Sequence, residues 1–468
     1  MARVGSFGYG VYGNESCMMI TDLDRRGFHR EAERCLETFL AYQGTAALPG
    51  DYASQEGVFN GAGGWESGGY NQHHGWILWA MAEHYRYTGD RAWLERNADK
   101  LIAACRWIIR ERARSGALDP ASLRGIERGL LPPGSLEDIG DWRCWLSNNL
   151  FSWWGLDAAA RALADVGHAR AKDLLAEAQA YRGDLLAAFR EAMVRSPLVR
   201  LSDGTWIPAM PSEVHRRGRT FGWITVTLEG PIYLIRTGAL APDDPLARCI
   251  MQDYEDNLYL SRQYGYPPED LADHWFSRGG FSMQPNLLCS PHPYLLRDEP
   301  KHFLRAYFNA FAVTYYPNTQ MLTEHPLPGM GDWRGDHYKS SDEANSTYWL
   351  RLAFVEERGE DLYLGMAVPR AWLADGGTPA IERAVTYFGP MSLRYESHAG
   401  QGSIRAVLDP PARRPPKRTF LRFRHPEGKP IVRVEIDGKP WDKFDAKRDL
   451  VELPPLGGPA TITAFYGK

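Results

Sequence analysis

Residues 72–114 read QHHGWILWAMAEHYRYTGDRAWLERNADKLIAACRWIIRERAR and predict two helices joined by a tight turn. In both halves apolar residues recur every three or four positions, which is the spacing of the buried stripe of an amphipathic helix. Thr88-Gly89-Asp90 lies between the halves and turns the chain. The stretch therefore predicts an αα-hairpin.

The same plan recurs along the first 357 residues. The stretch 143–195 repeats it, with Val166-Gly167-His168 as the turn. Periodicity, with glycine or proline between segments, predicts helices over 17–43, 72–89, 91–114, 143–166, 169–195, 220–237, 244–261, 299–316 and 341–357. This succession of hairpins indicates a mainly α domain.

After Leu364 the pattern changes to short runs of alternating polar and apolar residues, separated by glycines and prolines. The run 432–436 is followed by Asp437-Gly438, a favoured hairpin turn. Similar runs lie at 392–396, 420–424, 450–453 and 460–465. We therefore predict a helical domain over residues 1–370 and a C-terminal antiparallel β-sandwich over residues 371–468.

The composition describes an ordinary globular protein of two or three domains. Its 468 residues carry 44% hydrophobic and 24% charged side chains and a net charge of -4, which gives no reason to expect nucleic acid as a partner. No apolar run approaches a membrane span and no signal peptide is visible, so the chain as it stands is expected in the cytoplasm unless its beginning is missing. The six scattered cysteines form no C-x-x-C pair and predict buried thiols.

Aromatic residues are abundant, with 16 Trp and 23 Tyr, and they gather in loops beside carboxylates and histidines. The stretch 63–76 combines all three with glycines, ahead of a long helix. Indole rings offer flat apolar faces for sugar rings, glycines let the backbone approach a ligand, and Glu66 is able to give or take a proton. This favours carbohydrate binding; the alternative is a glycine-rich helix entry whose Trp65 and Trp76 pack into the core.

Helical hairpins with acidic, aromatic loops, followed by a β-sandwich, resemble the six-hairpin glycosidase superfamily, and within it the α-L-rhamnosidase-like branch. The motifs that carry the resemblance are residues 74–90, Gly140-Asp141-Trp142, Thr323-Glu324-His325 with Asp342-Glu343-Ala344, and residues 369–373 leading to Tyr387-Phe388-Gly389. The resemblance implies a toroid of about twelve inner and outer helices. Because nine or ten are indicated, and residues 8–15 look like an active-site loop from mid-domain, we expect a toroid shortened at its N-terminus.

Glycoside hydrolysis uses one carboxylic acid to protonate the leaving oxygen and a second carboxylate as base or nucleophile. In the rhamnosidase-like branch a glutamate of a late loop looks like the general base, and Glu324 matches it; Glu15 falls loosely where the branch keeps its general acid. Glu66 and Asp141 complete the candidates, of which Glu66 and Glu324 rank first. Glu324 and Asp141 have an alternative role in helix capping. The resemblance implies inversion, with the two carboxyl groups about 6.5–9.5 Å apart.

Aromatic, histidine and acidic side chains of the same loops are expected to bind the sugar. The predicted binding residues are Trp65, His74, Trp142, His274, Trp275, His325, Asp332 and Trp333. The histidines lack the i, i+4 spacing with a third ligand that metallohydrolases show, so hydrogen bonding to hydroxyls is the better interpretation and no metal is expected. For the loop 273–280, a packed irregular connection is the alternative.

These features predict a glycoside hydrolase that removes a terminal sugar from an oligo- or polysaccharide with two carboxylates and no cofactor. Two alternatives stay open. A polysaccharide lyase or unsaturated-uronide hydrolase on the same toroid would use Tyr or His as base and a cation near the uronate, which suits Arg278 and Arg334. A non-catalytic glycan-binding protein fits a shortened toroid.

Overall fold

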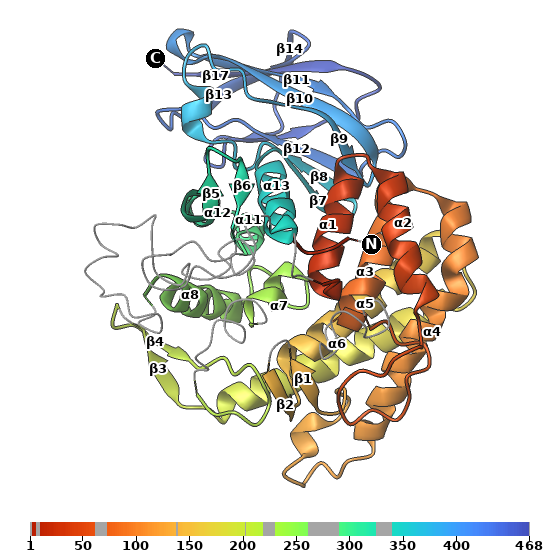
Figure 1. The fold of residues 1–468 in the computed structure, drawn as a ribbon. Coiled ribbons are helices and arrows are strands. Elements are labelled where there is room, and N and C mark those ends of the chain that lie inside the picture. The colour runs from red at the N-terminus through yellow and green to blue at the C-terminus, as the bar shows by residue number, and fades with distance from the viewer. Residues whose placement is uncertain are drawn as a thin grey trace.

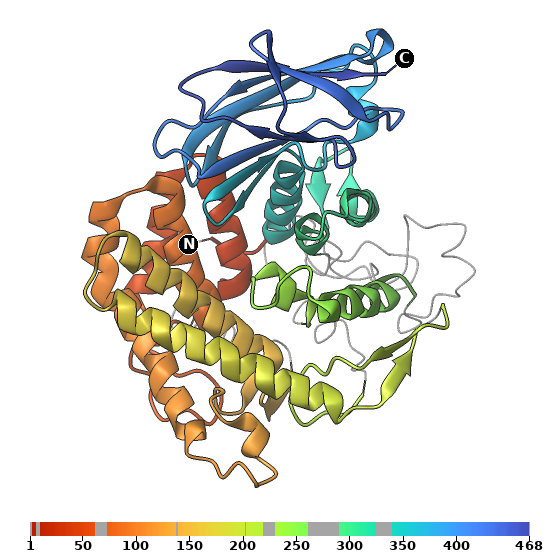
Figure 2. The same ribbon diagram turned by 180° about the vertical axis from the view of Figure 1, so that it is seen from behind.

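The computed structural model describes residues 2–5, 10–60, 73–136, 139–201, 203–218, 230–260, 290–323 and 339–467, with the backbone alone for 139, 257–260 and 313. In this part of the chain, α-helices and three two-stranded hairpins occupy the sequence as far as Phe354, and larger sheets begin at Val355 (Figure 1). The sheets pack on one end of the helical part, as the view from behind also shows (Figure 2). The predicted class, a mainly α domain followed by a β-sandwich, is confirmed.

The α-helices of the described residues alternate in space between two layers. They are α1 (Gly13–Arg25), α2 (His29–Ala41), α3 (His73–Thr88), α4 (Arg91–Gly116), α5 (Leu146–Asp165), α6 (Ala171–Val194), α7 (Ile232–Arg236), α8 (Pro245–Leu260), α11 (His292–Leu296), α12 (Pro300–Thr314) and α13 (Ser340–Phe354).

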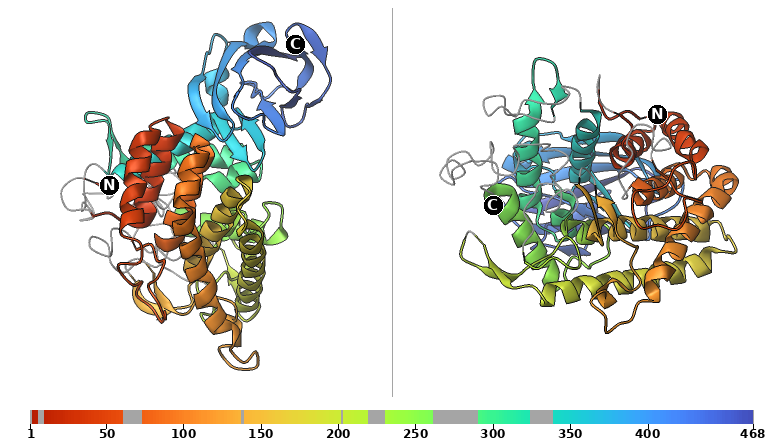
Figure 3. Two further views of the ribbon diagram at one scale, coloured as in Figure 1. Left: turned by 90° about the vertical axis from the view of Figure 1, so that its right-hand side faces the viewer. Right: turned by 60° about the horizontal axis from the view of Figure 1, so that its bottom comes forward.

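The inner layer is a ring of helices (Figure 3). Helix α1 contacts both α3 and α13, α3 contacts α5, α5 contacts α7, and α7 contacts α11. The side-chain ring centres of His292 in α11 and Tyr348 in α13 lie 6.2 Å apart, and this contact closes the ring of helices. Inner helix α3 buries every residue except Arg86 and Thr88, whereas outer helix α2 buries a single stripe around Leu36. Burial on all sides is what an inner position requires, so the described helices form an α/α toroid.

Two glycines set the close approach of inner helices α3 and α5. A Cβ added to Gly75 would lie 2.2 Å from the carbonyl oxygen of Phe151, and one added to Gly155 would lie 2.5 Å from the carbonyl oxygen of Gly75. No side chain fits in either position. The two helices are therefore in contact along their backbones.

One predicted helix is two in the structure. The segment 17–43 was expected to be continuous, but α1 ends at Arg25 and α2 starts at His29. Gly27 has a φ of 84° and the amide of Phe28 donates back to the carbonyl of Leu23, which is the geometry of a glycine-terminated helix end. Apolar periodicity continues across this break because both helices face the same core, so spacing alone did not reveal it.

The predicted hairpin turns are present at both places. Asp90 caps α4 by accepting from the amide of Trp93 at 2.8 Å, and Gly89 and Gly167 have φ values of 67° and 74°. Helix α5 starts at Leu146, later than the predicted 143, because the preceding residues form strand β2. Helix α11 has only five residues and escaped the periodicity analysis.

The C-terminal part is a sandwich of two sheets. The six-stranded sheet has the order β14-β13-β17-β11-β10-β9 and the five-stranded sheet the order β15-β16-β12-β8-β7. All described strand pairs of the sandwich are antiparallel except β8 with β12. The strands of the described residues are β1 (Gly134–Leu136), β2 (Ile139–Arg143), β3 (Leu198–Arg200), β4 (Trp206–Pro208), β5 (Tyr315–Tyr316), β6 (Met321–Leu322), β7 (Val355–Arg358), β8 (Asp361–Leu364), β9 (Ala380–Thr386), β10 (Gly389–His398), β11 (Ser403–Asp409), β12 (Arg418–Arg422), β13 (Ile431–Ile436), β14 (Lys439–Trp441), β15 (Phe444–Asp445), β16 (Leu450–Leu453) and β17 (Ala460–Tyr466).

The sheets begin earlier than the boundary predicted at residues 370–371. Strand β7 follows α13 directly and pairs with β8, so residues 355–364 belong to the five-stranded sheet. Glu356, Glu357, Glu360 and Asp361 in this run have little strand preference of their own, and pairing across the sheet decides their conformation. The hairpin turn at Asp437-Gly438 is present, with φ values of 50° and 75°.

Specific side chains attach the sandwich to the ring. Arg413 donates to the carbonyl oxygens of Arg86 and Tyr87 at 2.8 and 2.6 Å, at the C-terminal end of α3. The Tyr387 hydroxyl donates to Oε2 of Glu83 at 2.6 Å. The sandwich is therefore bound to the end of the ring where the inner helices finish. These contacts do not involve the opposite end, where the inner helices begin.

No helix of the described residues is both long and apolar enough to cross a membrane. Cys17, Cys105 and Cys144 are buried free thiols, and Cys35 and Cys249 are partly buried free thiols. Burial raises the pKa of Cys105 to about 12, so this thiol stays protonated. Cys289 lies outside the described residues.

Candidate functional site

The N-terminal ends of the inner helices meet at one end of the ring. At the start of α1, Gly13 packs so closely on His73, the first residue of α3, that an added Cβ would lie 2.9 Å from the His73 Cβ. At the start of α13, Ser340 donates its amide to the carbonyl of Val4 at 2.9 Å. These contacts bring three starting points of the ring together, and we treat this end as the candidate active site.

Most of the predicted site residues belong to segments that lead into these helix starts. Segments 61–72, 261–289 and 324–338 precede α3, α11 and α13 and lie outside the described residues. They contain Glu66, Trp65, His274, Trp275, Glu324, His325, Asp332 and Trp333. The described residues that flank segment 324–338 meet, since the amide of Lys339 donates to the carbonyl of Leu322 at 3.4 Å.

Glu15 is the predicted catalytic residue that the structure describes at this end. It lies in the first turn of α1 and is 8% exposed. Its Oε2 accepts from the Ser341 hydroxyl at 2.5 Å and lies 3.2 Å from Nζ of Lys339, which is buried. Ser341 and Lys339 thus both approach the same oxygen of Glu15 with donor groups. A carboxylate held in this way accepts hydrogen bonds, which suits binding to the hydroxyl groups of a ligand.

Further polar residues surround this ion pair. Asp342 follows Ser341 and, like Asn14 beside Glu15, is buried. Burial lowers the pKa of His73 to about 3, so its imidazole is neutral near pH 7. Sequence analysis quoted Asp342 only as part of a motif and missed Lys339 and Ser341. Nothing in the sequence around Lys339 indicates that it is buried. Its burial follows from its contact with Glu15 of α1, which is distant in sequence.

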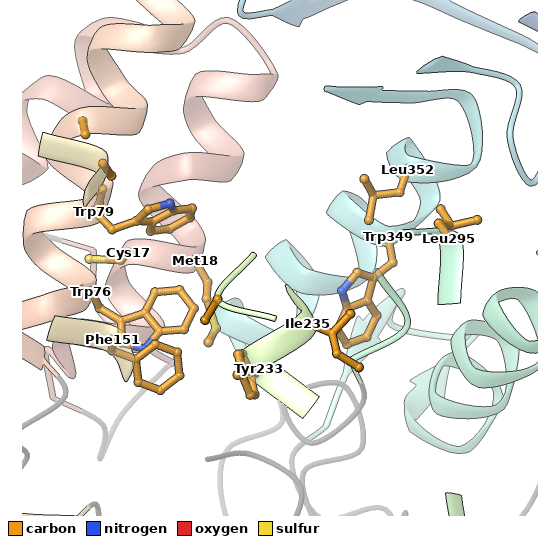
Figure 4. Close-up of a cluster of buried hydrophobic side chains, with 14 of the residues drawn as sticks. Cys17, Met18, Trp76, Trp79, Phe151, Tyr233, Ile235, Leu295, Trp349 and Leu352 are labelled. Carbon is orange, nitrogen blue, oxygen red and sulfur yellow. The ribbon is translucent and has the colours of Figure 1, made fainter. Parts of the chain in front are cut away.

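Apolar side chains fill the ring axis beyond these first turns (Figure 4). The rings of Trp76 and Phe151 lie 5.1 Å apart, and those of Phe151 and Tyr233 lie 5.2 Å apart, which links α3, α5 and α7. Met18 of α1 and Trp349 of α13 are buried in the same core. This packing gives the polar groups a rigid apolar support, as a site for positioning a ligand needs.

Several buried polar atoms near the helix starts have no hydrogen-bond partner among the described residues. They are Oγ of Ser147, Oδ1 of Asn148, Nε1 of Trp76 and Oδ1 of Asn60. Ser147 and Asn148 lie in the first turn of α5, Trp76 lies in the first turn of α3, and Asn60 directly precedes segment 61–72. Groups of this kind are available to water or to the hydroxyls of a ligand.

His74, predicted to contact sugar, lies in the core. Its Nδ1 accepts from the amide of Phe59 at 3.0 Å, its Nε2 is 3.2 Å from the carbonyl oxygen of Ala104, and its ring meets the edge of Trp107 at 4.7 Å. Burial lowers the pKa of His74 to about 4. Both ring nitrogens are engaged by backbone, which favours a role in holding α3 against α4.

Asp141 and Trp142 lie on strand β2 and are exposed. The Asp141 carboxylate pairs with Arg143 at 2.9 Å. The capping role considered for Asp141 is wrong, because α5 begins at Leu146 with Trp145 at the N-cap position and no side-chain cap. Asp141 instead belongs to strand β2, which pairs with β1 and ends at Arg143, before α5 begins.

A second concavity opens at the other end of the ring, beside the sandwich. This cavity of about 310 Å³ is lined by residues from the C-terminal ends of the inner helices, among them Arg25, Trp79, Glu83 and Tyr348. The Arg25 guanidinium stacks 3.7 Å from the centre of the Tyr348 ring, and Arg86 pairs with Glu83 at 3.1 Å. The first contact joins α1 to α13, and Glu83 also accepts from the Tyr387 hydroxyl of the sandwich. None of the predicted catalytic residues in the described part of the chain lines the cavity.

The fold is similar to that of two solved α-L-rhamnosidases. The Streptomyces avermitilis enzyme, complexed with L-rhamnose, matches with a TM-score of 0.51 and 14% identity, over 97% of this chain and 38% of that one. The enzyme from Dictyoglumus thermophilum matches with a TM-score of 0.50 and 10% identity, over 97% of this chain and 46% of that one.

This chain thus spans less than half the length of either rhamnosidase. No protein-family profile matches its sequence, and no curated protein matches it. At such low identity a structural match establishes architecture rather than activity. The chain has a six-hairpin glycosidase-like fold, a helical toroid followed by a β-sandwich, similar to that of α-L-rhamnosidases.

Proposed function

We propose that this chain is a glycoside hydrolase that removes a terminal sugar at the end of the ring where the inner helices begin. The observation that carries the proposal is the convergence of helix starts around Glu15. His73, which directly follows segment 61–72, packs on Gly13, and Lys339, which directly follows segment 324–338, pairs with Glu15. The two best carboxylate candidates from the sequence lie in those two segments.

The proposed reaction divides the work between two carboxyl groups. Glu66 gives its proton to the glycosidic oxygen as the bond from that oxygen to the anomeric carbon breaks. Glu324 takes a proton from water, whose oxygen bonds to the same carbon from the opposite face, so the configuration inverts. Glu15, arranged as an acceptor by Lys339 and Ser341, binds sugar hydroxyls rather than acting as the acid.

The proposed substrate is an α-L-rhamnoside. Two solved structures with a similar fold are α-L-rhamnosidases, and one of them holds L-rhamnose. At the same end of the ring, the buried Ser147 hydroxyl can donate and accept, Oδ1 of Asn148 accepts and Nε1 of Trp76 donates. Rhamnose combines several hydroxyls with a methyl group, which suits hydrogen-bonding groups set on an apolar support.

The test is a panel of aryl glycosides that includes the α-L-rhamnoside and the β-D-glucuronide. We expect release of the aryl alcohol from the rhamnoside, and a 10²- to 10⁴-fold loss of kcat in Glu66→Gln and in Glu324→Gln, roughly the contribution of one acid or base. Glu427→Gln, an exposed residue of the sandwich that pairs with Lys429, is the matched control and should keep full activity.

Three outcomes would contradict the proposal. Unchanged activity in both glutamine variants would remove the two carboxylates from the mechanism. An unsaturated uronate product, seen by its ultraviolet absorbance, would identify a lyase instead. Saccharide binding without turnover by any form would leave a glycan-binding protein. If hydrolysis occurs, NMR of the first sugar released distinguishes inversion from retention.

A further inference from the structure

A strongly basic cavity lies between helix α12 and the sandwich, away from the candidate active site. Its volume is about 320 Å³. Three carboxylates line it, Asp298, Glu299 and Asp449, against a larger set of cations. The cations are Lys301, Arg370, Arg422, Arg424, Lys447 and Arg448. With His302 neutral, the lining carries six positive and three negative charges, a net charge of +3.

The carboxylates of the cavity are already engaged. Asp449 pairs with Arg370 at 3.1 Å. Asp298 pairs with Arg422 at 2.6 Å through one oxygen and with Arg448 at 2.8 Å through the other. Glu299 pairs at 2.9 Å with Arg297, which does not line the cavity.

Arg424 is left without a carboxylate partner among the described residues. It is 4% exposed, and its one described hydrogen bond runs from Nη1 to the carbonyl oxygen of Val368 at 2.9 Å. Burial, together with the charges of Arg370 and Arg422, lowers the pKa of Arg424 to about 10. The side chain is still protonated at pH 7, so three buried or half-buried guanidinium groups face one space. Such a cluster is costly unless an anion shares it.

Helix α12 adds to the positive potential. Its first residues, Pro300, Lys301 and His302, line the cavity, so its N-terminal end opens there. Glu299 holds the N-cap position and makes no side-chain cap. The free amides of a first turn and the helix dipole attract anions.

We propose that this cavity binds a tetrahedral oxyanion, a phosphate or sulfate group, either free or carried by a small sugar. Arg424 and Arg370 contact the anion from the sandwich, Lys301 and the first turn of α12 from the ring, and the exposed Lys447 and Arg448 close the mouth. Guanidinium groups match such oxyanions through paired hydrogen bonds. A bound anion also neutralises the contact between ring and sandwich at this point.

Calorimetric titration of the full chain at constant ionic strength tests the proposal. The probes are inorganic phosphate, sulfate, glucose 6-phosphate and, as controls, sodium chloride and glucose. We expect saturable binding of phosphate and sulfate, none of chloride or glucose, and an increase in Tm with phosphate. Tighter binding of glucose 6-phosphate than of phosphate identifies a sugar-borne group; equal or weaker binding identifies the free ion.

Three variants keep the result interpretable. Arg424→Met, of similar length, removes the buried charge and should weaken phosphate binding at least tenfold while leaving Tm in phosphate-free buffer equal or higher. Lys447→Ala combined with Arg448→Ala changes exposed residues and should also weaken binding, whereas Lys443→Ala, exposed and outside the cavity lining, should not. No saturable phosphate binding by the wild type, or equal affinity in Arg424→Met, would overturn the site.

Discussion

At the scale of single residues, a buried ion pair joins the first and last helices of the ring. Glu15 of α1 and Lys339, directly before α13, are 324 positions apart in the chain and 3.2 Å apart in space. The sequence pointed to Glu15 through a loose resemblance but gave no reason to connect it with Lys339. A buried pair of this kind costs desolvation on both sides, so its presence at the end where helices begin favours a role in binding.

Lys339→Met should destabilise the protein by about 3–5 kcal/mol, because it leaves Glu15 buried without its counter-charge. Adding Glu15→Gln to that variant should recover most of the loss, since the uncompensated charge is then gone. Urea unfolding of the two single variants and the double variant measures this. Lys429→Met, which breaks an exposed pair with Glu427, is the control and should shift stability by no more than about 1 kcal/mol. Additive effects of the two changes would show that the pair does not couple.

At the scale of elements, contact between inner helices depends on glycine. Gly75 of α3 faces the backbone of α5 at Phe151, with no space for a Cβ, whereas Gly183 in the middle of outer helix α6 has nothing within 4 Å of its added Cβ. Both glycines are helical, and the neighbouring sequence does not show which of them lies against another helix. The difference arises because α3 is packed on all sides and α6 on one.

The same substitution should therefore have opposite effects at these two positions. Gly75→Ala should lower the free energy of unfolding by about 3 kcal/mol or more, because α3 and α5 must separate. Gly183→Ala should raise it by about 0.5–1 kcal/mol through helix propensity and a less flexible unfolded chain. Thermal unfolding of both variants compares them directly. A stabilising Gly75→Ala would contradict the close contact of the inner helices.

At the scale of the whole molecule, folding holds two adjacent histidines neutral in the ring. The folded-state pKa is about 3 for His73 and about 4 for His74, and burial is the leading cause in both. In the unfolded chain the ordinary value is about 6.5. Above pH 6.5 neither state takes up these protons. Between pH 6.5 and 4 the unfolded state binds up to two more protons than the folded state, so the histidines favour unfolding as the pH falls.

We expect the free energy of unfolding to fall below pH 6.5, with the two histidines contributing up to about 2.7 kcal/mol per pH unit. His74→Gln should roughly halve that contribution, and His398→Gln, at an exposed position on β10, should leave the slope unchanged. Urea unfolding at several pH values gives the slope of the free energy of unfolding against pH. This slope, rather than the absolute stability, is compared between the variants and the wild type. A His74→Gln variant with the wild-type slope would mean that this histidine is protonated inside the folded protein.

Local features of the chain determined the succession of helices, the turns at Gly89 and Gly167, the hairpin at Asp437-Gly438 and the change from helices to strands. Each depends on residues a few positions apart, on periodicity or on the backbone freedom of glycine, so each can be read from the sequence. The resemblance in the order of motifs extended this to the toroid and sandwich architecture, which the structural similarity to α-L-rhamnosidases confirms.

Tertiary structure alone decided which polar residues are buried and with which partners. His74 was expected at a sugar and packs in the core, Asp141 was expected beside a helix and lies on an exposed strand, and Lys339 pairs with Glu15 from 324 positions away in the chain. The basic cavity around Arg424 likewise forms only where α12 meets the sandwich. Burial and pairing are set by contacts between segments distant in sequence, and the spacing of residues along one segment carries no information about them.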